Sequence, residues 1–153
     1  MKDKDKNSEN LLNELKGLKQ ENLSLTELYN KFLIECGKKE KALRESEENY
    51  RLLLELAPDA FFQGNREGYF IMANKKATLL TGYTNEELLS MGMRDLFPES
   101  VMNMKPLRFD LLNKGDKVTT ERNLLCKDGS IITVEMTSLQ MPNKTYQSFV
   151  RDI

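Results

Sequence analysis

Residues 68–88 read GYFIMANKKATLLTGYTNEEL, and this stretch decides the fold. Its first apolar run follows a turn rich in glycine and polar residues, and another apolar run, residues 60–63, precedes that turn. Two short apolar runs on either side of such a turn predict a β-hairpin. Asn74 is a suitable cap for a short helix that ends at Gly82. Thr84, followed by acidic residues, is a suitable cap for a second short helix.

The sequence that follows predicts one more helix and three further strands. We expect the helix between about residues 100 and 113 and the strands at residues 118–126, 131–138 and 146–153. In the middle strand, apolar residues alternate with threonine and glutamate, which is typical of a half-buried strand in an antiparallel sheet. The order of elements therefore predicts an α+β fold, a five-stranded antiparallel sheet with short helices, preceded by a long N-terminal α-helix.

The N-terminal third has a different pattern, because apolar residues recur with alternating spacings of four and three from Leu11 to Leu53. A repeat of about 3.5 residues held over that length stays on one helix face only when the helix supercoils around a partner. We expect a parallel two-stranded coiled coil in which Asn22 meets its symmetry mate and fixes the register. The expected dimer contacts are Leu11, Leu15, Leu18, Asn22, Leu25, Tyr29, Phe32, Cys36, Leu43 and Tyr50.

Two alternatives remain open for this segment. In one, an amphipathic helix packs its stripe on its own domain, although a helix of about forty residues is about 60 Å long and exceeds what a small domain can cover. In the other, the helix breaks near Ser24, where the sequence offers an N-cap. The expected organisation is a disordered charged start at residues 1–8, a coiled-coil signalling helix at residues 9–48 and one domain at residues 49–153.

Composition excludes several classes of function. The 153 residues contain no histidine, which excludes Ser-His-Asp and Cys-His catalysis, histidine-containing zinc sites and histidine-ligated haem. Two cysteines alone cannot complete a zinc site, so neither a catalytic residue nor a metal site is predicted. The 23 basic and 24 acidic residues are evenly mixed, which argues against a nucleic-acid partner and an anionic membrane. Because no stretch has the pattern of a spanning helix or a signal peptide, a cytoplasmic location is expected.

Several motifs occur in an order that resembles the PAS domain family. They lie at residues 49–62, 68–74, 80–88, 121–122, 127–130 and 150–153. Residues 42–48 also resemble the connector helix that feeds such domains in bacterial and archaeal sensor kinases. The resemblance implies a sensor domain whose sheet and short helices enclose a pocket and whose flanking helices transmit a change. It also implies a signal output through Arg151 and Asp152 toward an effector such as a histidine kinase beyond residue 153.

Two departures from the family restrict which cofactors the domain can be expected to hold. The photoactive flavin branch has a cysteine in an Asn-Cys-Arg-Phe-Leu-Gln motif, whereas residues 92–97 here read GMRDLF. The haem branch uses a histidine, which this sequence lacks. The resemblance therefore implies neither haem nor a flavin-reactive site, and the expected occupant of the pocket is an unidentified small apolar or carboxylate ligand.

The expected ligand pocket follows from strand alternation and from the faces of the short helices. Arg122 shares the parity of Leu124 in its strand, so its guanidinium can enter the pocket and hold a carboxylate in a bidentate pair. A surface cross-strand pair, or a one-residue bulge that turns Arg122 outward, is the open alternative. The expected lining is Phe62, Phe70, Met72, Leu80, Leu112, Arg122, Leu124, Ile132, Val134 and Phe149.

These features favour sensing and signal relay by a parallel homodimer that is coupled to a downstream kinase or effector. The alternative is a ligand-free scaffold for protein interaction or dimerisation, whose domain core is filled by its own side chains. A cavity with convergent polar groups would favour the sensor, and a close-packed core would favour the scaffold.

Overall fold

The computed structural model describes the backbone of residues 2–153 and the side chains from Asp5 onward. The chain divides into two compact units, of which one ends at Asn49 and the other spans Tyr50–Ile153. The expected start of the domain, residue 49, is the last residue of the first unit.

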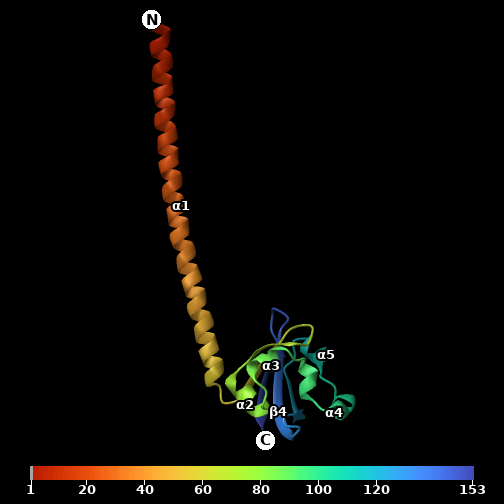
Figure 1. Ribbon diagram of the computed structural model, residues 1–153. Helices are drawn as coiled ribbons and strands as arrows, with labels where there is room; N and C mark the ends of the chain where they lie inside the picture. The colour runs from red at the N-terminus through yellow and green to blue at the C-terminus, as the bar shows by residue number, and fades with distance from the viewer. Residues whose placement is uncertain (1) are drawn as a thin grey trace. The chain divides into compact units, whose positions relative to one another are not determined.

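The first unit is formed by helix α1, Lys2–Leu56, whose last turns belong to the second unit. Figure 1 shows α1 as one helix without interruption, so the alternative break near Ser24 does not occur. The Thr26 hydroxyl instead donates to the backbone carbonyl of Asn22, 2.8 Å away within the helix. The disorder expected at residues 1–8 is wrong from the second residue onward, because this segment is helical and contains neither proline nor glycine.

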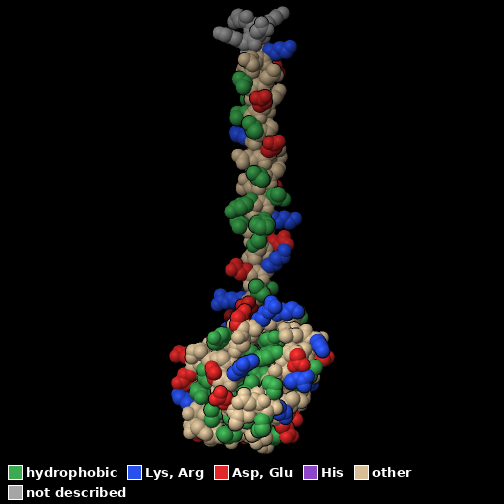
Figure 2. Space-filling view, turned by 90° about the vertical axis from the view of Figure 1, so that its right-hand side faces the viewer, with side chains coloured by type: hydrophobic (Ala, Val, Ile, Leu, Met, Phe, Trp, Pro, Cys, Tyr) green, Lys and Arg blue, Asp and Glu red, His purple; other side chains and the backbone are tan. Residues whose placement is uncertain are grey.

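The apolar stripe of α1 is exposed throughout the first unit. All side chains from Asp5 to Asn49 are exposed, and the large apolar side chains Leu18 and Phe32 are 63% and 61% exposed. Figure 2 shows these hydrophobic side chains at the surface of α1, interspersed with charged ones. The stripe therefore has no partner within its own unit. No helix in the described part of the chain is both long and apolar enough to cross a bilayer.

The second unit is built on one antiparallel sheet of five strands in the order β2-β1-β5-β4-β3. A tight hairpin joins β1 and β2, and the three later strands form a meander whose last strand, β5, lies beside β1. The five-stranded antiparallel sheet expected from the sequence is confirmed. The strands are β1 (Ala60–Gly64), β2 (Phe70–Ala73), β3 (Val118–Leu125), β4 (Ile131–Gln140) and β5 (Tyr146–Asp152).

Short helices connect β2 to β3 and pack on one face of the sheet, which we call the inner face (Figure 1). Most of the buried core lies between this face and the helices, and it includes Phe62, Leu88, Leu96, Val134 and Val150. The helices are α2 (Lys75–Thr81), α3 (Asn85–Leu89), the 3-10 turn η1 (Met93–Leu96), α4 (Glu99–Met104) and α5 (Phe109–Leu112).

The single helix expected at residues 100–113 is instead the pair α4 and α5, separated by a segment that contains Pro106. Proline lacks a backbone donor, and its ring clashes with the preceding helical turn, so a helix cannot continue through it without distortion. The residue before it, Lys105, has a φ of -137°, which is extended rather than helical. This break forms a short linker, residues 105–108, that takes part in the site described below.

Asn74 joins three parts of the second unit through one buried side chain. Its carboxamide oxygen accepts from the backbone N–H groups of Phe61 and Ala77, at 2.9 and 3.0 Å. Its carboxamide nitrogen donates to the carbonyl of Leu54 at 2.8 Å and to that of Asp59 at 3.2 Å. The predicted N-cap of α2 therefore also fixes the end of α1 against β1.

Candidate functional site

A cavity lies between the inner face of the sheet and the segment from η1 to α5. The cavity has a volume of about 50 Å³ and is partly open to solvent. Strands β1, β2, β3, β4 and β5 all contribute to its wall, and η1, the linker and α5 close the opposite side. Its lining is mostly apolar, which is the usual character of a small-molecule site.

Five of the ten residues expected in the pocket line this cavity: Phe62, Phe70, Leu112, Arg122 and Leu124. Three others lie next to it without contributing to its wall. Val134 is fully buried in the core, and Leu80 and Ile132 are partly buried against the same core. Leu80 and Ile132 instead line a separate surface pocket near Gly82.

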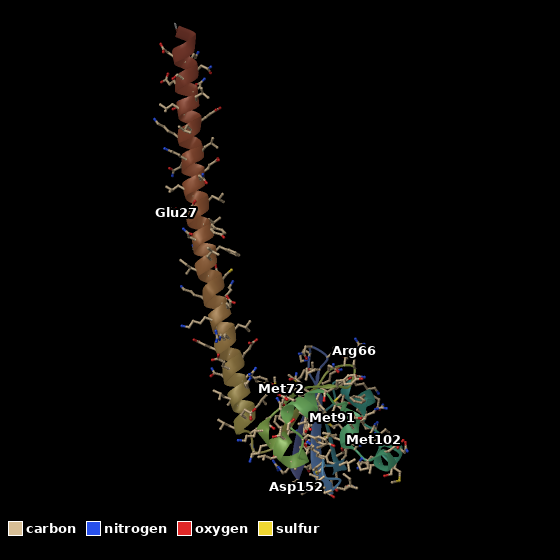
Figure 3. The ribbon with its side chains drawn as sticks, viewed as in Figure 1. Glu27, Arg66, Met72, Met91, Met102 and Asp152 are labelled. Atoms are coloured by element: carbon tan, nitrogen blue, oxygen red, sulfur yellow. The ribbon has the colours of Figure 1, made fainter. Side chains whose placement is uncertain are left out.

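Met72 was expected beside Phe70, but it lies on the outer face of the sheet. Phe70 is opposite Gly64 in β1, whereas Met72 is opposite Gln63, so Ile71 is an extra residue in β2. A β-bulge of this kind shifts the alternation by one residue, which turns Met72 away from the cavity. Met72 lines a surface hollow together with Phe61, whereas Met102, also labelled in Figure 3, packs against the inner core.

Phe149 was also expected in the pocket, and it too lies on the outer face. Its ring packs on that of Phe61, with the ring centroids 5.2 Å apart. In β5 the cavity is lined instead by Tyr146, Ser148 and Val150, which alternate with Phe149. The sequence did not show which parity of β5 faces inward, because apolar residues occur at both parities.

Sequence reasoning missed several residues that line the cavity. Met136 follows Val134 in the alternation of β4, so strand parity alone predicts it. The alternation of β4 also places Ser138 on the inner face, where its hydroxyl shares a hydrogen bond of 2.7 Å with that of Ser148. The irregular segment contributes residues whose position no periodicity reveals: Met93, Leu96, Phe97, Leu107 and Phe109.

Arg122 points into the protein, so the alternatives that placed it on the surface are wrong. Only 3% of the residue is exposed, and its parity is that of the core residue Leu124. Its guanidinium lies over the ring of Phe97, with 5.7 Å between the central carbon and the ring centroid. Burial lowers the pKa of Arg122, because desolvation disfavours the charged form.

The guanidinium of Arg122 holds the linker between α4 and α5. Its Nη1 donates to the carbonyl of Lys105 at 2.6 Å, and its Nη2 donates to the carbonyl of Pro106 at 2.8 Å. Its Nε donates to the hydroxyl of Thr120 at 3.2 Å. In return, the Lys105 ammonium donates to the backbone carbonyl of Glu121 at 3.0 Å. The linker is therefore attached to β3 from both sides.

A second arginine, Arg108, lines the same cavity but has its own carboxylate. Its Nε and Nη2 donate to the two carboxylate oxygens of Asp110, each at 2.9 Å. The hydrogen bond from Arg108 lowers the pKa of Asp110 to about 2. Both side chains are about half exposed, so this pair is neutral as a unit and lies in contact with solvent.

A surface groove adjoins the cavity. The two share the side chains of Met93, Phe109 and Tyr146, which form the partition between them. The rings of Phe109 and Tyr146 pack edge to face with centroids 4.9 Å apart. The groove also contains three basic residues, Arg66, Arg94 and Lys144, on its solvent side; Figure 3 labels Arg66 in the turn between β1 and β2.

The expected output residues lie at the end of β5. The Arg151 guanidinium donates to both carboxylate oxygens of Asp59, at 3.0 and 2.9 Å, and this pair raises the pKa of Arg151. Asp152 is exposed at the end of the strand (Figure 3). Tyr50, expected in the dimer seam, accepts a hydrogen bond of 3.0 Å from the side chain of Gln147 in β5. The rest of the expected seam lies exposed on α1.

Comparisons with known proteins agree on the fold. The chain is similar to a domain of the sensory box sensor histidine kinase/response regulator from Geobacter sulfurreducens, with 24% identity, a TM-score of 0.64, and coverage of 72% of this chain and 96% of that one. It is similar to the PAS domain of an HTR-like protein from Haloarcula marismortui, with 21% identity, a TM-score of 0.61, and coverage of 76% and 98%.

A third similar structure is a PAS domain from Desulfitobacterium hafniense, with 27% identity, a TM-score of 0.57, and coverage of 65% of this chain and 97% of that one. No curated protein matches the chain. A family model described as a PAS domain matches residues 58–153, more than half of the chain. On the strength of that match, together with the sheet order and the cavity under the helices, the chain belongs to the PAS domain family.

Proposed function

We propose that this chain is a sensory signal-transduction module that binds a small molecule in its cavity and relays the change to an output such as a histidine kinase. The cavity is the observation that carries this proposal. It lies between the sheet and the helical segment with part of it open to solvent, and most of its wall is apolar. Burial of a ligand there would alter the packing of the segment from η1 to α5.

The names of similar structures support a role in signalling. One of them comes from a sensory box sensor histidine kinase/response regulator, and another is a PAS domain from a two-component sensor histidine kinase. The output end of the present domain is also suited to relay. The Arg151–Asp59 pair connects the last strand to the segment between α1 and β1, so the incoming and outgoing chain segments meet there.

We further propose that the module works as a parallel dimer of two α1 helices. The support is the exposure of the stripe, in which Leu11, Leu25, Tyr29 and Leu43 are each 60–64% exposed. Large apolar side chains with a sustained spacing of four and three are stabilised when a second helix with the same stripe covers them. A second copy of this chain carries that stripe, and a parallel arrangement brings the two domains and their outputs to the same end.

Light scattering of the full chain tests the dimer. Phe32→Glu places two carboxylates in the expected seam and should convert the dimer to a monomer with a folded domain. Asn30→Glu is the matched control, because it adds the same charge to a nearby position outside the stripe. A monomeric unmodified chain, or equal effects of the two variants, would contradict the coiled-coil dimer.

The ligand site is tested by filling the cavity. Ser148 lines it, so Ser148→Met should occupy part of the free space and abolish stabilisation by any small molecule that binds there. Glu135→Met is the control, because Glu135 is exposed on the outer face of the sheet. If the unmodified protein gains no thermal stability from any member of a small-molecule library, the ligand-free scaffold becomes the better account.

A further inference from the structure

Arg122 has a buried positive charge that no carboxylate balances. The residue is 3% exposed, and no carboxylate oxygen of the described side chains lies within ion-pairing distance of it. A buried charge is costly unless an opposite charge or several hydrogen bonds compensate it. The three acceptors around Arg122 are two carbonyls and one hydroxyl, all of them neutral. The site therefore favours the arrival of an anion.

The guanidinium also retains capacity to donate. A guanidinium has five N–H groups, of which one is on Nε and two are on each Nη. Arg122 donates once from each of its three nitrogens, so one N–H on Nη1 and one on Nη2 are without a protein acceptor. These N–H groups can donate to a further acceptor, and a carboxylate is among the acceptors that a guanidinium binds most strongly.

The rest of the wall shows which kind of anion fits. Arg108, the other cation that lines the cavity, is neutralised by Asp110. The hydroxyls of Ser138 and Ser148 bond to each other, and the remaining surface is chiefly aliphatic, aromatic and thioether. A phosphate with two charges would be poorly compensated by one cation in such surroundings. An anion with one charge and an apolar body fits better, because Arg122 balances the charge and the apolar wall covers the body.

We propose that the cavity takes a small monocarboxylate with an apolar body, whose carboxylate binds Arg122 and whose body lies among Phe62, Phe97, Leu112 and Met136. This inference rests on the proposed sensing function and names the class of ligand. It also identifies the part of the protein that responds first. Arg122 also holds the carbonyls of Lys105 and Pro106, so a carboxylate that binds the same guanidinium acts directly on the linker between α4 and α5.

The test compares acids with amides of the same shape in the unmodified chain. Propanoate and butanoate are titrated alongside propanamide and butanamide, with binding measured by calorimetry. Nitrogen-15 NMR follows the Nε–H signal of Arg122 and the backbone amide of Lys105. We expect each acid to bind about tenfold to a hundredfold more tightly than its amide, because hydrogen bonds to a charged partner are the stronger ones. The acids should shift both NMR signals.

Arg122→Met supplies a second measurement, since it removes the charge while keeping an unbranched side chain. In this variant the preference for acid over amide should disappear, whereas Arg51→Met, an exposed site away from the cavity, should retain it. If Arg122→Met does not fold, the NMR titration of the unmodified chain decides the matter.

Equal binding of acids and amides would overturn the carboxylate assignment and leave the sensing function standing. Failure of both acids to bind, or binding that leaves the Arg122 signal unchanged, would also overturn the inference. The proposed function itself is judged separately, by what the purified protein carries, as described at the end of the Discussion.

Discussion

The thioether of Met93 occupies the space that a side chain on Gly64 would need. A β-carbon at Gly64 would overlap the Sδ of Met93 and crowd its methyl group, which lies 2.9 Å from that position. Gly64 ends β1, and Met93 begins η1, so the absence of a side chain in the strand lets the turn approach the sheet closely. Because Met93 separates the cavity from the groove, the absence of a side chain at Gly64 allows this partition to lie close to β1.

We expect Gly64→Ala to destabilise the domain by up to about 1 kcal/mol, because the atoms it meets form the flexible end of the Met93 side chain, which must move aside. Met93→Ala removes the obstructing side chain, so the double variant should be more stable than the sum of the two single effects predicts. Urea unfolding of the four proteins measures this coupling. Strictly additive effects would show that the two residues do not constrain each other.

Asn74 is expected to be the most sensitive polar residue of the domain, because its side chain makes four hydrogen bonds at a nearly buried position. Asn74→Ala leaves two N–H groups and two carbonyls without this partner and should lower the free energy of unfolding by about 3 kcal/mol. Asn85→Ala, at an exposed position in α3, is the control and should change it little. Chemical denaturation compares the two, and similar small losses would contradict the bridging role of Asn74.

The Glu87–Lys127 pair should make stability depend on pH. The Lys127 ammonium donates to both carboxylate oxygens of Glu87, and this hydrogen bonding lowers the pKa of Glu87 below its ordinary value of 4.5. A carboxyl with a lowered pKa in the folded protein contributes stability above its ordinary pKa and loses it as the pH falls through the lowered value. Protonation removes the charge that Lys127 binds.

Glu87→Gln keeps a hydrogen-bonding group in the capping box with Thr84 but removes the charge. It should therefore lower the melting temperature near neutral pH, and the difference from the unmodified chain should shrink as the pH falls toward about 3. Glu86→Gln is the control, since Glu86 is exposed and makes no ion pair with any side chain that the structure describes. A difference that stays constant across this range would contradict the charge pairing.

Regular periodicity decided which features of this fold were predictable. The caps at Asn74 and Thr84 were visible because each polar side chain precedes a short apolar run, and both caps are present. Strand alternation predicted Leu124 as an inward residue of β3, where no bulge intervenes, and left the direction of Arg122 open. It failed in β2, because the sequence around Ile71 has no glycine or other sign that one residue is extra.

The cavity wall formed by η1 and the connecting segments was harder to predict from the sequence. Met93, Phe97 and Leu107 lie in a 3-10 turn and in connecting segments, where tertiary packing rather than a repeat sets the direction of each side chain. The break at Pro106 was foreseeable from its missing donor, yet its consequence was not. Only the structure shows that the carbonyls of this linker are the acceptors of Arg122.

The two cysteines should differ in their response to oxidation. Cys36 is exposed on α1 at a position expected in the dimer seam, whereas Cys126 is buried, with its thiol directed to the carbonyl of Leu80 at 3.5 Å. Mild oxidation should give a disulfide-linked dimer that Cys36→Ser abolishes and Cys126→Ser leaves intact, as seen on a non-reducing gel. A cross-link that survives Cys36→Ser would contradict the parallel register, in which each Cys36 faces its mate.

Native mass spectrometry of the purified full chain tests the central claim most directly, because it reports subunits and bound small molecules in one spectrum. We expect a native mass equal to two chains plus one small molecule for each chain, which is released when the protein is denatured and is absent from the Ser148→Met variant. Two chains with no added mass, in preparations that also gain no thermal stability from any small molecule, would contradict the sensing account and favour a ligand-free dimerisation scaffold.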